Sequence, residues 1–285
     1  MAQLLLVIFF LLGMIIGGFL NVVVLRYGTK KKNGRSMCFS CGKTLRWFEL
    51  VPMLSFLVQG GRCRGCKSQI SWQYISVELL TGLVFALVFW KNSFLLVSGY
   101  SVIQLLVIGC EFLLWSLLIA LSVYDIKHKI IPEALVYSAC FVSLLVLLLS
   151  YRETYNLQLT TYNFFSGFFF AIPFALLWFF SRGQAMGLGD AKLMLLFPWL
   201  LGLAKGLSAL IIGFWIGAAV GLSALLLKMF VVHMPRSLYP NLRSKLRRVT
   251  MKSELPFGPF LVLGLFLVYL FGWDVTGLSL LLQNS

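Results

Sequence analysis

Acidic residues are scarce in this sequence. Its 285 residues include only nine Asp or Glu, of which three are Asp, against 24 Lys or Arg. Charged residues make up 12% of the chain, about half of their usual share in a soluble domain. This shortage excludes an ordinary soluble protein. The 60% share of hydrophobic residues indicates a chain that crosses a membrane several times.

Two common catalytic motifs are also absent. The chain has no G-x-S-x-G and no H-E-x-x-H pattern, so neither a hydroxyl nucleophile of that kind nor a metalloprotease zinc site is supported. The two histidines, His128 and His233, each lie in a basic loop. A lone histidine in such a loop is usually solvated, and we assign neither one a role.

Long apolar segments make up most of the chain. A membrane-spanning helix needs roughly 20 apolar residues, and eight segments approach or exceed that length. The predicted fold is an all-α, polytopic membrane helix bundle of about eight spans. The predicted spans are residues 3–25, 72–90, 100–123, 133–151, 162–180, 190–204, 206–230 and 256–273, of which the sixth is short.

The first apolar segment lacks the charged start and the small-residue cleavage site of a signal peptide. We therefore expect it to be retained as a span. Gly13, Gly17 and Gly18 lie along it, and small residues favour close packing between membrane helices.

Basic residues concentrate in alternate loops. Loops 26–71, 124–132, 181–192 and 228–255 hold 10, 2, 2 and 7 Lys or Arg, which is 21 of the 24. Loops that are rich in Lys and Arg stay in the cytoplasm, so the asymmetry predicts a cytoplasmic location for these four. Topology and contact with anionic lipid account for the net charge of +15, and we expect no nucleic-acid partner.

Four of the six cysteines form two C-x2-C pairs in the first basic loop. Cys38 and Cys41 are separated from Cys63 and Cys66 by 21 residues, a spacing typical of a tetrahedral four-cysteine zinc site. Two disulfides are the alternative, which a reducing compartment disfavours. We therefore predict a structural zinc ion. The predicted division is a first transmembrane span at 1–25, a cytoplasmic zinc module at 26–71 and a transmembrane bundle at 72–285.

Apolar residues occupy the stretch between the two cysteine pairs. They include Trp47, Phe48, Phe56 and Leu57. We interpret them as the packed interior of the module, and the alternative is that they lie on the membrane surface.

Four residues inside predicted spans carry polar or reactive groups. Cys110 and Cys140 are expected to behave as small hydrophobic residues. Glu78 and Glu111 are buried carboxyl groups, which are costly in a membrane unless they are paired or protonated. We interpret both as hydrogen-bonding groups between helices, with a functional carboxylate as the alternative.

One aspartate lies at the start of the sixth apolar segment. Asp190 follows Gly187 and Gly189 in the run Met-Gly-Leu-Gly-Asp-Ala-Lys. Because glycine has no Cβ, this run permits left-handed turns and close approach by another backbone or a substrate. An ionisable group at a membrane boundary is a functional candidate, and a solvated Asp in a glycine-rich loop is the alternative.

Asp125 is the expected partner of Asp190. It ends the third predicted span, and Pro132 starts the next helix at the position that tolerates its missing N–H. The predicted topology places Asp125 and Asp190 at the same, cytoplasmic depth, whereas Asp274 falls at the opposite face. Two carboxyl groups held close together cannot both ionise cheaply, so one of them keeps its proton. Such a pair supplies the acid and the base of an aspartic protease.

Taken together, these motifs resemble the prepilin peptidases, also called type IV leader peptidases, over nearly the whole chain. The matching features are Gly17-Gly18-Phe19-Leu20-Asn21-Val22-Val23, the four cysteines with Trp47, Pro52 to Phe56 and Gly61 to Arg64, Glu78, Asp125 with Ile131-Pro132, Gly187 to Lys192, and Pro256-Phe257-Gly258-Pro259.

The resemblance implies an aspartic endopeptidase of the bacterial inner membrane. Such enzymes remove short basic leaders from type IV prepilins and pseudopilins at the cytoplasmic face, commonly between Gly and Phe, and Asp125 and Asp190 match their catalytic residues. Many relatives are also S-adenosylmethionine-dependent N-methyltransferases of the new N-terminus, and a four-cysteine domain is typical of these bifunctional forms. This chain has no G-x-G-x-x-G cradle, so S-adenosylmethionine as a cofactor rests on the resemblance alone.

Two functions from other classes remain open. A presenilin-like intramembrane aspartic protease shares the G-x-G-D chemistry but has no reason to carry a cytoplasmic four-cysteine module. A transporter or an assembly scaffold would use the carboxylates for protons or ions and would cleave no substrate.

Overall fold

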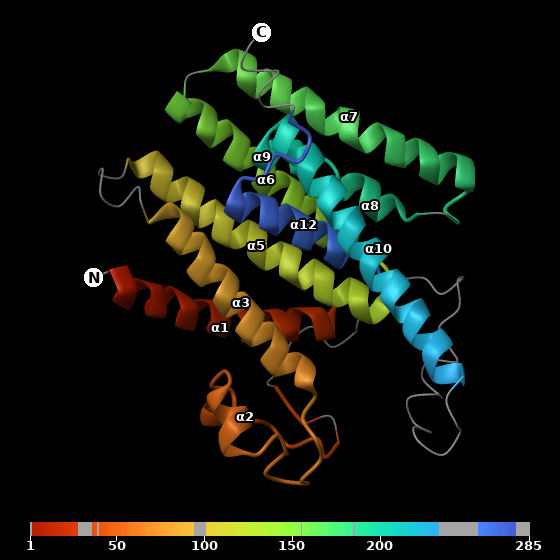
Figure 1. Ribbon diagram of the computed structural model, residues 1–285. Coiled ribbons are helices and arrows are strands. Elements are labelled where there is room, and N and C mark those ends of the chain that lie inside the picture. Colours follow the sequence, from red (N-terminus) through yellow and green to blue (C-terminus); the bar gives the residue numbers. More distant parts are fainter. Residues whose placement is uncertain are drawn as a thin grey trace.

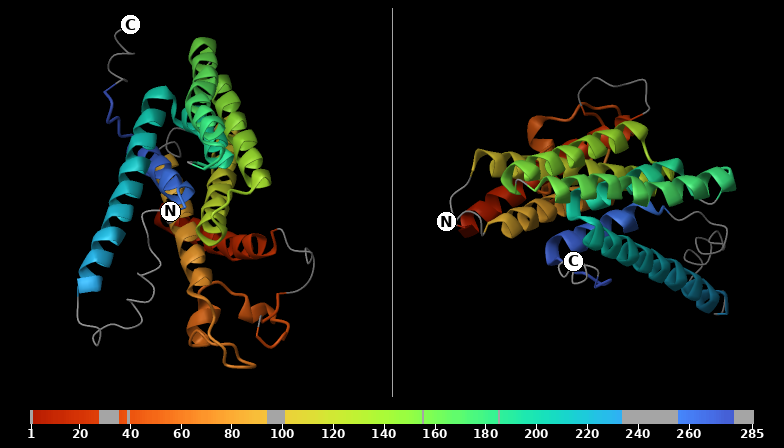
Figure 2. Two further views of the ribbon diagram at one scale, coloured as in Figure 1. Left: turned by 90° about the vertical axis from the view of Figure 1, so that its right-hand side faces the viewer. Right: turned by 90° about the horizontal axis from the view of Figure 1, so that it is seen from above.

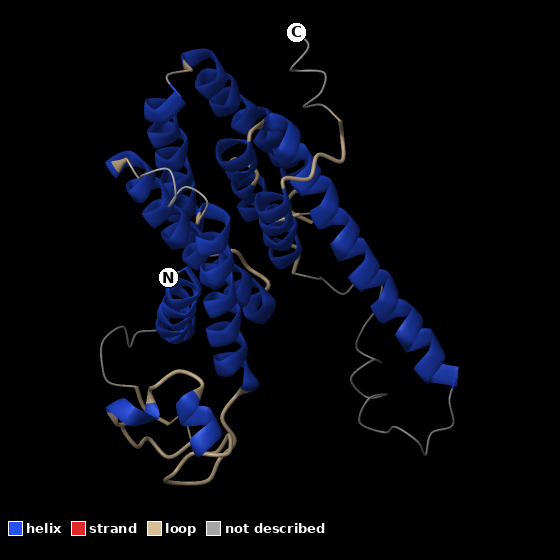
Figure 3. Cartoon of the chain, turned by 60° about the vertical axis from the view of Figure 1, so that its left-hand side comes forward, coloured by secondary structure: helices blue, strands red, loops and turns tan. Residues whose placement is uncertain are grey.

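The computed structural model describes residues 2–27, 36–38, 40–93, 101–154, 156–184, 186–233 and 256–277. Figure 3 shows helices and loops in this part of the chain and no strand. The long helices are α1 (Ala2–Arg26), α3 (Trp72–Asn92), α5 (Val102–His128), α6 (Glu133–Thr154), α7 (Leu157–Ser181) and α10 (Leu203–His233). The shorter ones are η1 (Trp47–Glu49), α2 (Leu54–Val58), α8 (Leu188–Leu193), α9 (Leu196–Leu201) and α12 (Gly258–Phe271).

Six of these helices are long and apolar enough to cross a membrane, namely α1, α3, α5, α6, α7 and α10. In Figure 1, α5 and α12 lie in the middle of the view, and Figures 1 and 2 show the far part of α10 extending away from the other helices. The predicted all-α membrane bundle is therefore confirmed.

The sixth predicted span is not one continuous helix. The structure divides it into α8 and α9, each of six residues, with turn residues Met194 and Leu195 between them. Gly202 ends α9 with a φ of +79°, a conformation that glycine adopts without steric cost. The last predicted span, residues 256–273, is also shorter than expected, because the corresponding helix α12 has only 14 residues.

Glycines bring α1 and α3 into close contact, as predicted. A Cβ on Gly13 would lie 2.7 Å from the carbonyl oxygen of Thr81, and a Cβ on Gly17 would lie 2.8 Å from the Cα of Glu78. Gly18 is less tightly packed, since a Cβ there would lie 3.5 Å from the nearest atom of Glu78. The backbones of α1 and α3 can approach this closely only because two of these positions carry no side chain.

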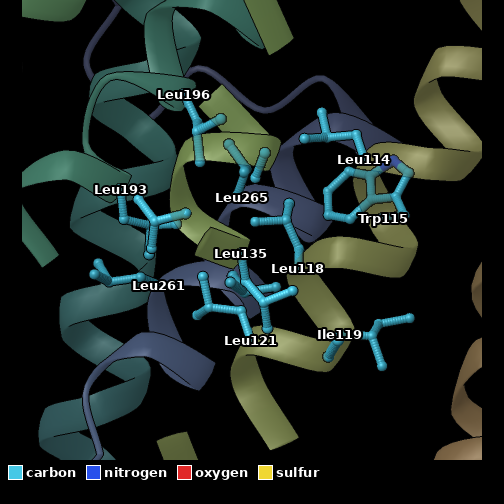
Figure 4. Packing of buried hydrophobic residues seen from close by; sticks show 14 of the residues in the cluster. Leu114, Trp115, Leu118, Ile119, Leu121, Leu135, Leu193, Leu196, Leu261 and Leu265 are labelled. Carbon is cyan, nitrogen blue, oxygen red and sulfur yellow. The ribbon is translucent and has the colours of Figure 1, made fainter. Parts of the chain in front are cut away.

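The hydrophobic core is centred on α5. Figure 4 shows its side chains facing residues of α6, α8, α9 and α12. Trp115 of α5 is 1% exposed and packs edge-on against Phe266 of α12, with ring centroids 4.7 Å apart. The core residues labelled in Figure 4 are Leu114, Trp115, Leu118, Ile119, Leu121, Leu135, Leu193, Leu196, Leu261 and Leu265.

Glu111 joins three helices through hydrogen bonds. Its Oε2 atom accepts a hydrogen bond from the hydroxyl of Tyr269 in α12 at 2.7 Å and from Nδ2 of Asn92 in α3 at 2.9 Å. A buried carboxyl group is tolerated when its oxygens are hydrogen-bonded. The interpretation of Glu111 as a bonding group between helices is confirmed.

Glu78 has a different role from the one that we expected. Its Oε2 accepts a hydrogen bond from the backbone N–H of Met53 at 2.8 Å. Met53 belongs to the loop between the two cysteine pairs and not to another spanning helix. Glu78 therefore attaches the cysteine-containing segment to α3.

The segment between α1 and α3 forms a small unit at the end of the bundle, which we call the cysteine module (residues 36–38 and 40–71). Figure 1 shows it beyond the first residues of α3. Trp47 is 80% exposed and Leu57 is 60% exposed. The interpretation of this stretch as a packed interior is therefore wrong for these two side chains, although Phe48 and Phe56 are half-buried.

Candidate active site and metal centre

Asp125 lies in the last turn of α5. Its carboxyl group is buried, and Oδ2 accepts a hydrogen bond from the backbone N–H of Gly258 at 3.1 Å. Lys129, with a φ of +55°, ends the helix by donating its N–H to the carbonyl of Asp125 at 2.7 Å. The backbone and the side chain of Asp125 are thus both fixed at this helix end.

Asp190 lies in the first turn of α8. Gly187 precedes the helix in an extended conformation, and its carbonyl accepts the N–H of Asp190 at 3.2 Å. The side chain is buried, and Oδ1 has no hydrogen-bond partner among the described residues. A buried carboxyl oxygen without a partner is costly, and such a group requires an explanation.

Ile131 lies between two glycines that are close to the two aspartates. A Cβ on Gly189, beside Asp190, would lie 2.7 Å from the Cβ of Ile131, and a Cβ on Gly258 would lie 3.6 Å from Cδ1 of Ile131. The same Cβ on Gly258 would lie 2.8 Å from Oδ2 of Asp125. The start of α8, the loop after α5 and the start of α12 therefore meet at one point, with both carboxyl groups beside it.

The glycines before Asp190 do not form a left-handed turn, but they leave room for another segment to pack closely. Neither Gly187 nor Gly189 has a positive φ. Gly189 allows Ile131 to contact the backbone of α8. Of the two uses that we predicted for these glycines, only the close approach of another segment is confirmed.

The charge of Asp125 acts on the carboxyl group of Asp190. Helix α8 lies outside the six membrane-capable helices. Burial and, second, the nearby carboxylate of Asp125 raise the pKa of Asp190 to about 7, against a smaller opposing effect of the Gly187 backbone. Asp190 therefore holds a proton in a substantial part of the molecules at neutral pH.

Contacts with α6 fix the position of α8. Lys192 forms an ion pair with Glu133 at 3.1 Å, and its ammonium group lies 4.5 Å from the centre of the Tyr137 ring. The thiol of Cys140 lies 3.6 Å from the carbonyl oxygen of Lys192. Pro132 directly precedes α6 and is not its first helical residue, since the helix begins at Glu133.

Gly258 is the site residue whose role the sequence did not reveal. The run Pro256-Phe257-Gly258-Pro259 is one of the motifs that resemble the prepilin peptidases, and the sequence predicts no role for its glycine. A glycine between two prolines is a signal for an unusual backbone position, but nothing in the sequence indicates which side chain it meets. Its partner, Asp125, lies 133 positions earlier in the chain.

The four predicted zinc ligands lie together in the cysteine module. Cys38, Cys41, Cys63 and Cys66 have their sulfur atoms within 4.8 Å of one another. None of them forms a disulfide. The two pairs also share one backbone pattern, in which the residue after the second cysteine has a positive φ.

In this pattern, Gly42 donates its N–H to the carbonyl of Cys38 at 2.9 Å, and Lys67 donates to that of Cys63 at the same distance. The two loops therefore present their thiols from equivalent turns.

The cluster fits a tetrahedral zinc ion. A Zn–S distance of about 2.3 Å requires sulfur atoms about 3.8 Å apart, and the sulfurs of Cys38 and Cys66 are separated by 3.8 Å. Backbone N–H groups of Cys41 and Ser40 lower the pKa of the Cys38 thiol to about 6. Zinc binds the thiolate form of cysteine. The lowered pKa therefore favours metal binding by Cys38 at neutral pH. Ser68, which was not predicted, lies 3.1 Å from the sulfur of Cys66.

The remaining residues considered in the sequence make other contacts or lie outside the described side chains. His128 is exposed and stacks on Tyr124, with ring centroids 4.4 Å apart. Asp274 contacts Ser208 and Thr276. The side chain of His233 and the basic loop at 234–255 lie outside the described residues.

Comparison with known proteins covers most of the chain. Residues 11–92 match the Bacterial Peptidase A24 N-terminal domain, and residues 112–222 match the Type IV leader peptidase family. No solved structure matches the chain.

Three relatives illustrate the similarity. A prepilin leader peptidase/N-methyltransferase of Pseudomonas aeruginosa is 25% identical over 93% of this chain and 90% of its own length. The same name applies to a protein of Myxococcus xanthus that is 40% identical over 44% of this chain, where the match spans 35% of the relative. A type 4 prepilin-like proteins leader peptide-processing enzyme of Escherichia coli is 30% identical over 64% of this chain and 71% of its own length. The chain therefore belongs to the type IV leader peptidase family.

Proposed function

We propose that this protein is a membrane aspartic endopeptidase that removes the basic leader from type IV prepilins or pseudopilins. In this proposal Asp125 and Asp190 form the catalytic dyad, at the cytoplasmic face of the bacterial inner membrane. The observation that carries the proposal is the meeting of two buried aspartates beside Ile131, one of them with an unpartnered carboxyl oxygen. The basic loops support the cytoplasmic orientation.

The hydrogen bond from Gly258 supports a division of labour within the dyad. A hydrogen bond to a carboxylate stabilises its charged form, so Asp125 is assigned as the general base. Asp190 is assigned as the acid, because its raised pKa keeps a proton available near neutrality. The pair titrates as a unit, so these assignments describe the dominant arrangement at the start of the reaction.

The first step is attack by water on the scissile carbonyl carbon. Asp125 takes a proton from the water as its oxygen forms a bond to that carbon. Asp190 donates its proton to the carbonyl oxygen, where negative charge develops. The product of this step is a tetrahedral gem-diol, with Asp125 protonated and Asp190 charged.

The second step breaks the C–N bond. Asp125 returns its proton to the amide nitrogen, which leaves as the amine of the mature pilin. Asp190 recovers a proton from a hydroxyl of the gem-diol as the carboxyl group of the leader forms. Both aspartates then have the protonation states in which they started.

Relatives named as N-methyltransferases support a second activity. We propose that the chain also methylates the new N-terminus, with S-adenosylmethionine as the methyl donor. The match to the N-terminal family domain, which spans the four cysteines, agrees with this proposal. When bound, S-adenosylmethionine would supply an electrophilic methyl group, and the described residues define no cradle for it.

Replacing Gly258 with alanine tests the arrangement of the dyad. The added Cβ would lie 2.8 Å from Oδ2 of Asp125, so the carboxylate or the start of α12 has to move. Misplacement of a catalytic group by about 1 Å can cost about 100-fold in rate, and we expect cleavage to fall by roughly 10- to 100-fold. Cleavage of a purified prepilin, followed by mass spectrometry, provides the measurement.

Gly109→Ala is the matched control. Gly109 also lies in a helix, but a Cβ at that position meets nothing within 4 Å. The Gly109→Ala variant should cleave the prepilin at the same rate as the wild type. Equal rates for Gly258→Ala and the wild type would contradict the close contact between α12 and Asp125.

The position of the scissile bond provides the main test of the proposed function. A prepilin inserted with its apolar helix beside the spans presents its leader junction at the cytoplasmic boundary. Moving the Gly-Phe junction four residues into the apolar segment shifts it by roughly 6 Å along a helix, well beyond the reach of about 3 Å that a general base has. We expect severe loss of cleavage, with membrane insertion of the substrate retained.

The control substrate has a leader that is longer by four residues before an unmoved junction, and it should be cleaved normally. Equal cleavage at both depths would favour an intramembrane protease of the presenilin type. No cleavage of any prepilin, with the protein folded, would instead favour a transporter or an assembly scaffold.

A further inference from the structure

The short helix α2 presents an apolar face that no other part of the described chain covers. Leu54, Leu57 and Val58 are 60%, 60% and 66% exposed. Their spacing of three and four residues places them on one side of a helix. The half-buried Phe56 turns the other way, toward Gly61 and Trp72. The exposed apolar face of Leu54, Leu57 and Val58 is therefore directed away from its own module.

Exposed tryptophans accompany this face. Trp47 in η1 and Trp72 at the start of α3 are 80% and 72% exposed. Tryptophan is enriched where a protein crosses the boundary between water and lipid. Large apolar patches on a protein surface usually mark an interaction site.

The position of α2 along the bundle indicates what covers the face. Trp72 is the first residue of a membrane-capable helix, and its ring lies 5.3 Å from the ring of Phe56 in α2. Met53, directly before α2, is hydrogen-bonded to Glu78 inside α3. Helix α2 is therefore attached beside the first two turns of α3, at the level where this membrane-capable helix begins.

The charge of the cysteine module fits an anionic surface. In the described part of the module, the basic residues are exposed and the acidic residue is buried. That acid, Glu49, is already paired with Lys43 at 3.4 Å. The exposed basic residues are Lys43, Arg46, Arg62, Arg64 and Lys67. Anionic headgroups attract such a cluster near the membrane surface.

We propose that the apolar face of α2 (Leu54, Leu57 and Val58) inserts into the headgroup region of an anionic lipid bilayer. The basic residues of the module then contact the lipid phosphates. This arrangement holds the module against the membrane beside the start of α3. It stands independently of the proposed peptidase reaction.

Photo-crosslinking from two positions of the full-length, zinc-loaded chain tests this proposal. A benzophenone amino acid replaces Leu57 in one variant and the exposed Gln69 of the second cysteine loop in the other. Each variant is placed in nanodiscs of phosphatidylcholine, with or without phosphatidylglycerol, and irradiated. Mass spectrometry of the module peptides then identifies the adducts, and zinc content with monodisperse elution verifies that both variants are folded.

We expect roughly tenfold more lipid adduct at Leu57 than at Gln69, because an interfacial helix buries its apolar face among the acyl chains. Phosphatidylglycerol should increase the yield at Leu57, and added salt should reduce that increase through screening. Equal lipid adducts at the two positions would overturn the proposal. Adducts of Leu57 with a second copy of the chain, or with an added prepilin in place of lipid, would overturn it too and identify the actual occupant.

Discussion

Asp125→Asn and Asp190→Asn are each expected to lower prepilin cleavage by roughly 10⁴-fold or more, the loss seen when one member of a catalytic unit is removed. Asparagine keeps the shape of the side chain but cannot hold the proton that the dyad shares. Both variants should therefore fold, insert into the membrane and bind zinc as the wild type does. Initial rates on a purified prepilin provide the measurement.

The double variant tests whether the two aspartates act as a unit. Because loss of either one disables the pair, Asp125→Asn with Asp190→Asn should be no slower than either single variant. Asp274→Asn is the control, since it changes the third aspartate of the chain, which contacts Ser208 and Thr276 and not the dyad. Substantial cleavage by both single variants would refute the assignment.

Loss of zinc is expected to unfold the cysteine module. In the described part of the module, side-chain contacts of Cys38 with Cys66 and Ser68 link the two cysteine loops, and structural zinc sites contribute apparent binding energies of about 10 kcal/mol or more. Cys63 is the most buried of the four ligands, so Cys63→Ser should abolish zinc binding and expose residues 36–71 to protease. Zinc content and limited proteolysis provide the readouts, with Cys110→Ser as a cysteine control outside the cluster.

The proposed aspartate dyad should remain partly active after this change. Four thiolates would leave no open position on the metal for water, so zinc held there would be structural and the proposed cleavage by Asp125 and Asp190 would not require it directly. Methylation is expected to suffer if the module helps to bind the donor. Wild-type protein without zinc, or with two disulfides under reducing conditions, would contradict the metal site.

Composition predicted the type of fold well, because long apolar runs in a membrane have few alternatives to helices. Predictions from the sequence were wrong where tertiary contacts determine the local structure. The apolar run at 190–204 was interpreted as a span, but the structure breaks it at Met194 and Leu195 and so places Asp190 in a short helix beside α6. Apolar character alone does not distinguish a broken, buried segment from a spanning one.

The two sites were predictable to different degrees. The cysteine cluster follows from local spacing, since each pair forms a tight turn on its own. The proximity of Asp125 and Asp190 was inferred only from their shared depth in the membrane. Depth alone does not say whether two residues at the same level lie side by side. The contacts of Gly189 with Ile131 and of Gly258 with Asp125 depend on helix packing, and no sequence pattern supplies that information.

The titration of the aspartate carboxyl groups tests the dyad most directly. The chain has three Asp, so protein labelled with ¹³C at the Asp side-chain carboxyl gives three resonances, with Asp274 as an internal reference. We predict that Asp190 titrates with a midpoint of about 7. Removing the neighbouring negative charge with Asp125→Asn should lower this midpoint, since a like charge disfavours ionisation. It should stay above the ordinary Asp value of about 3.9 because burial remains. An unchanged midpoint in Asp125→Asn would contradict the dyad.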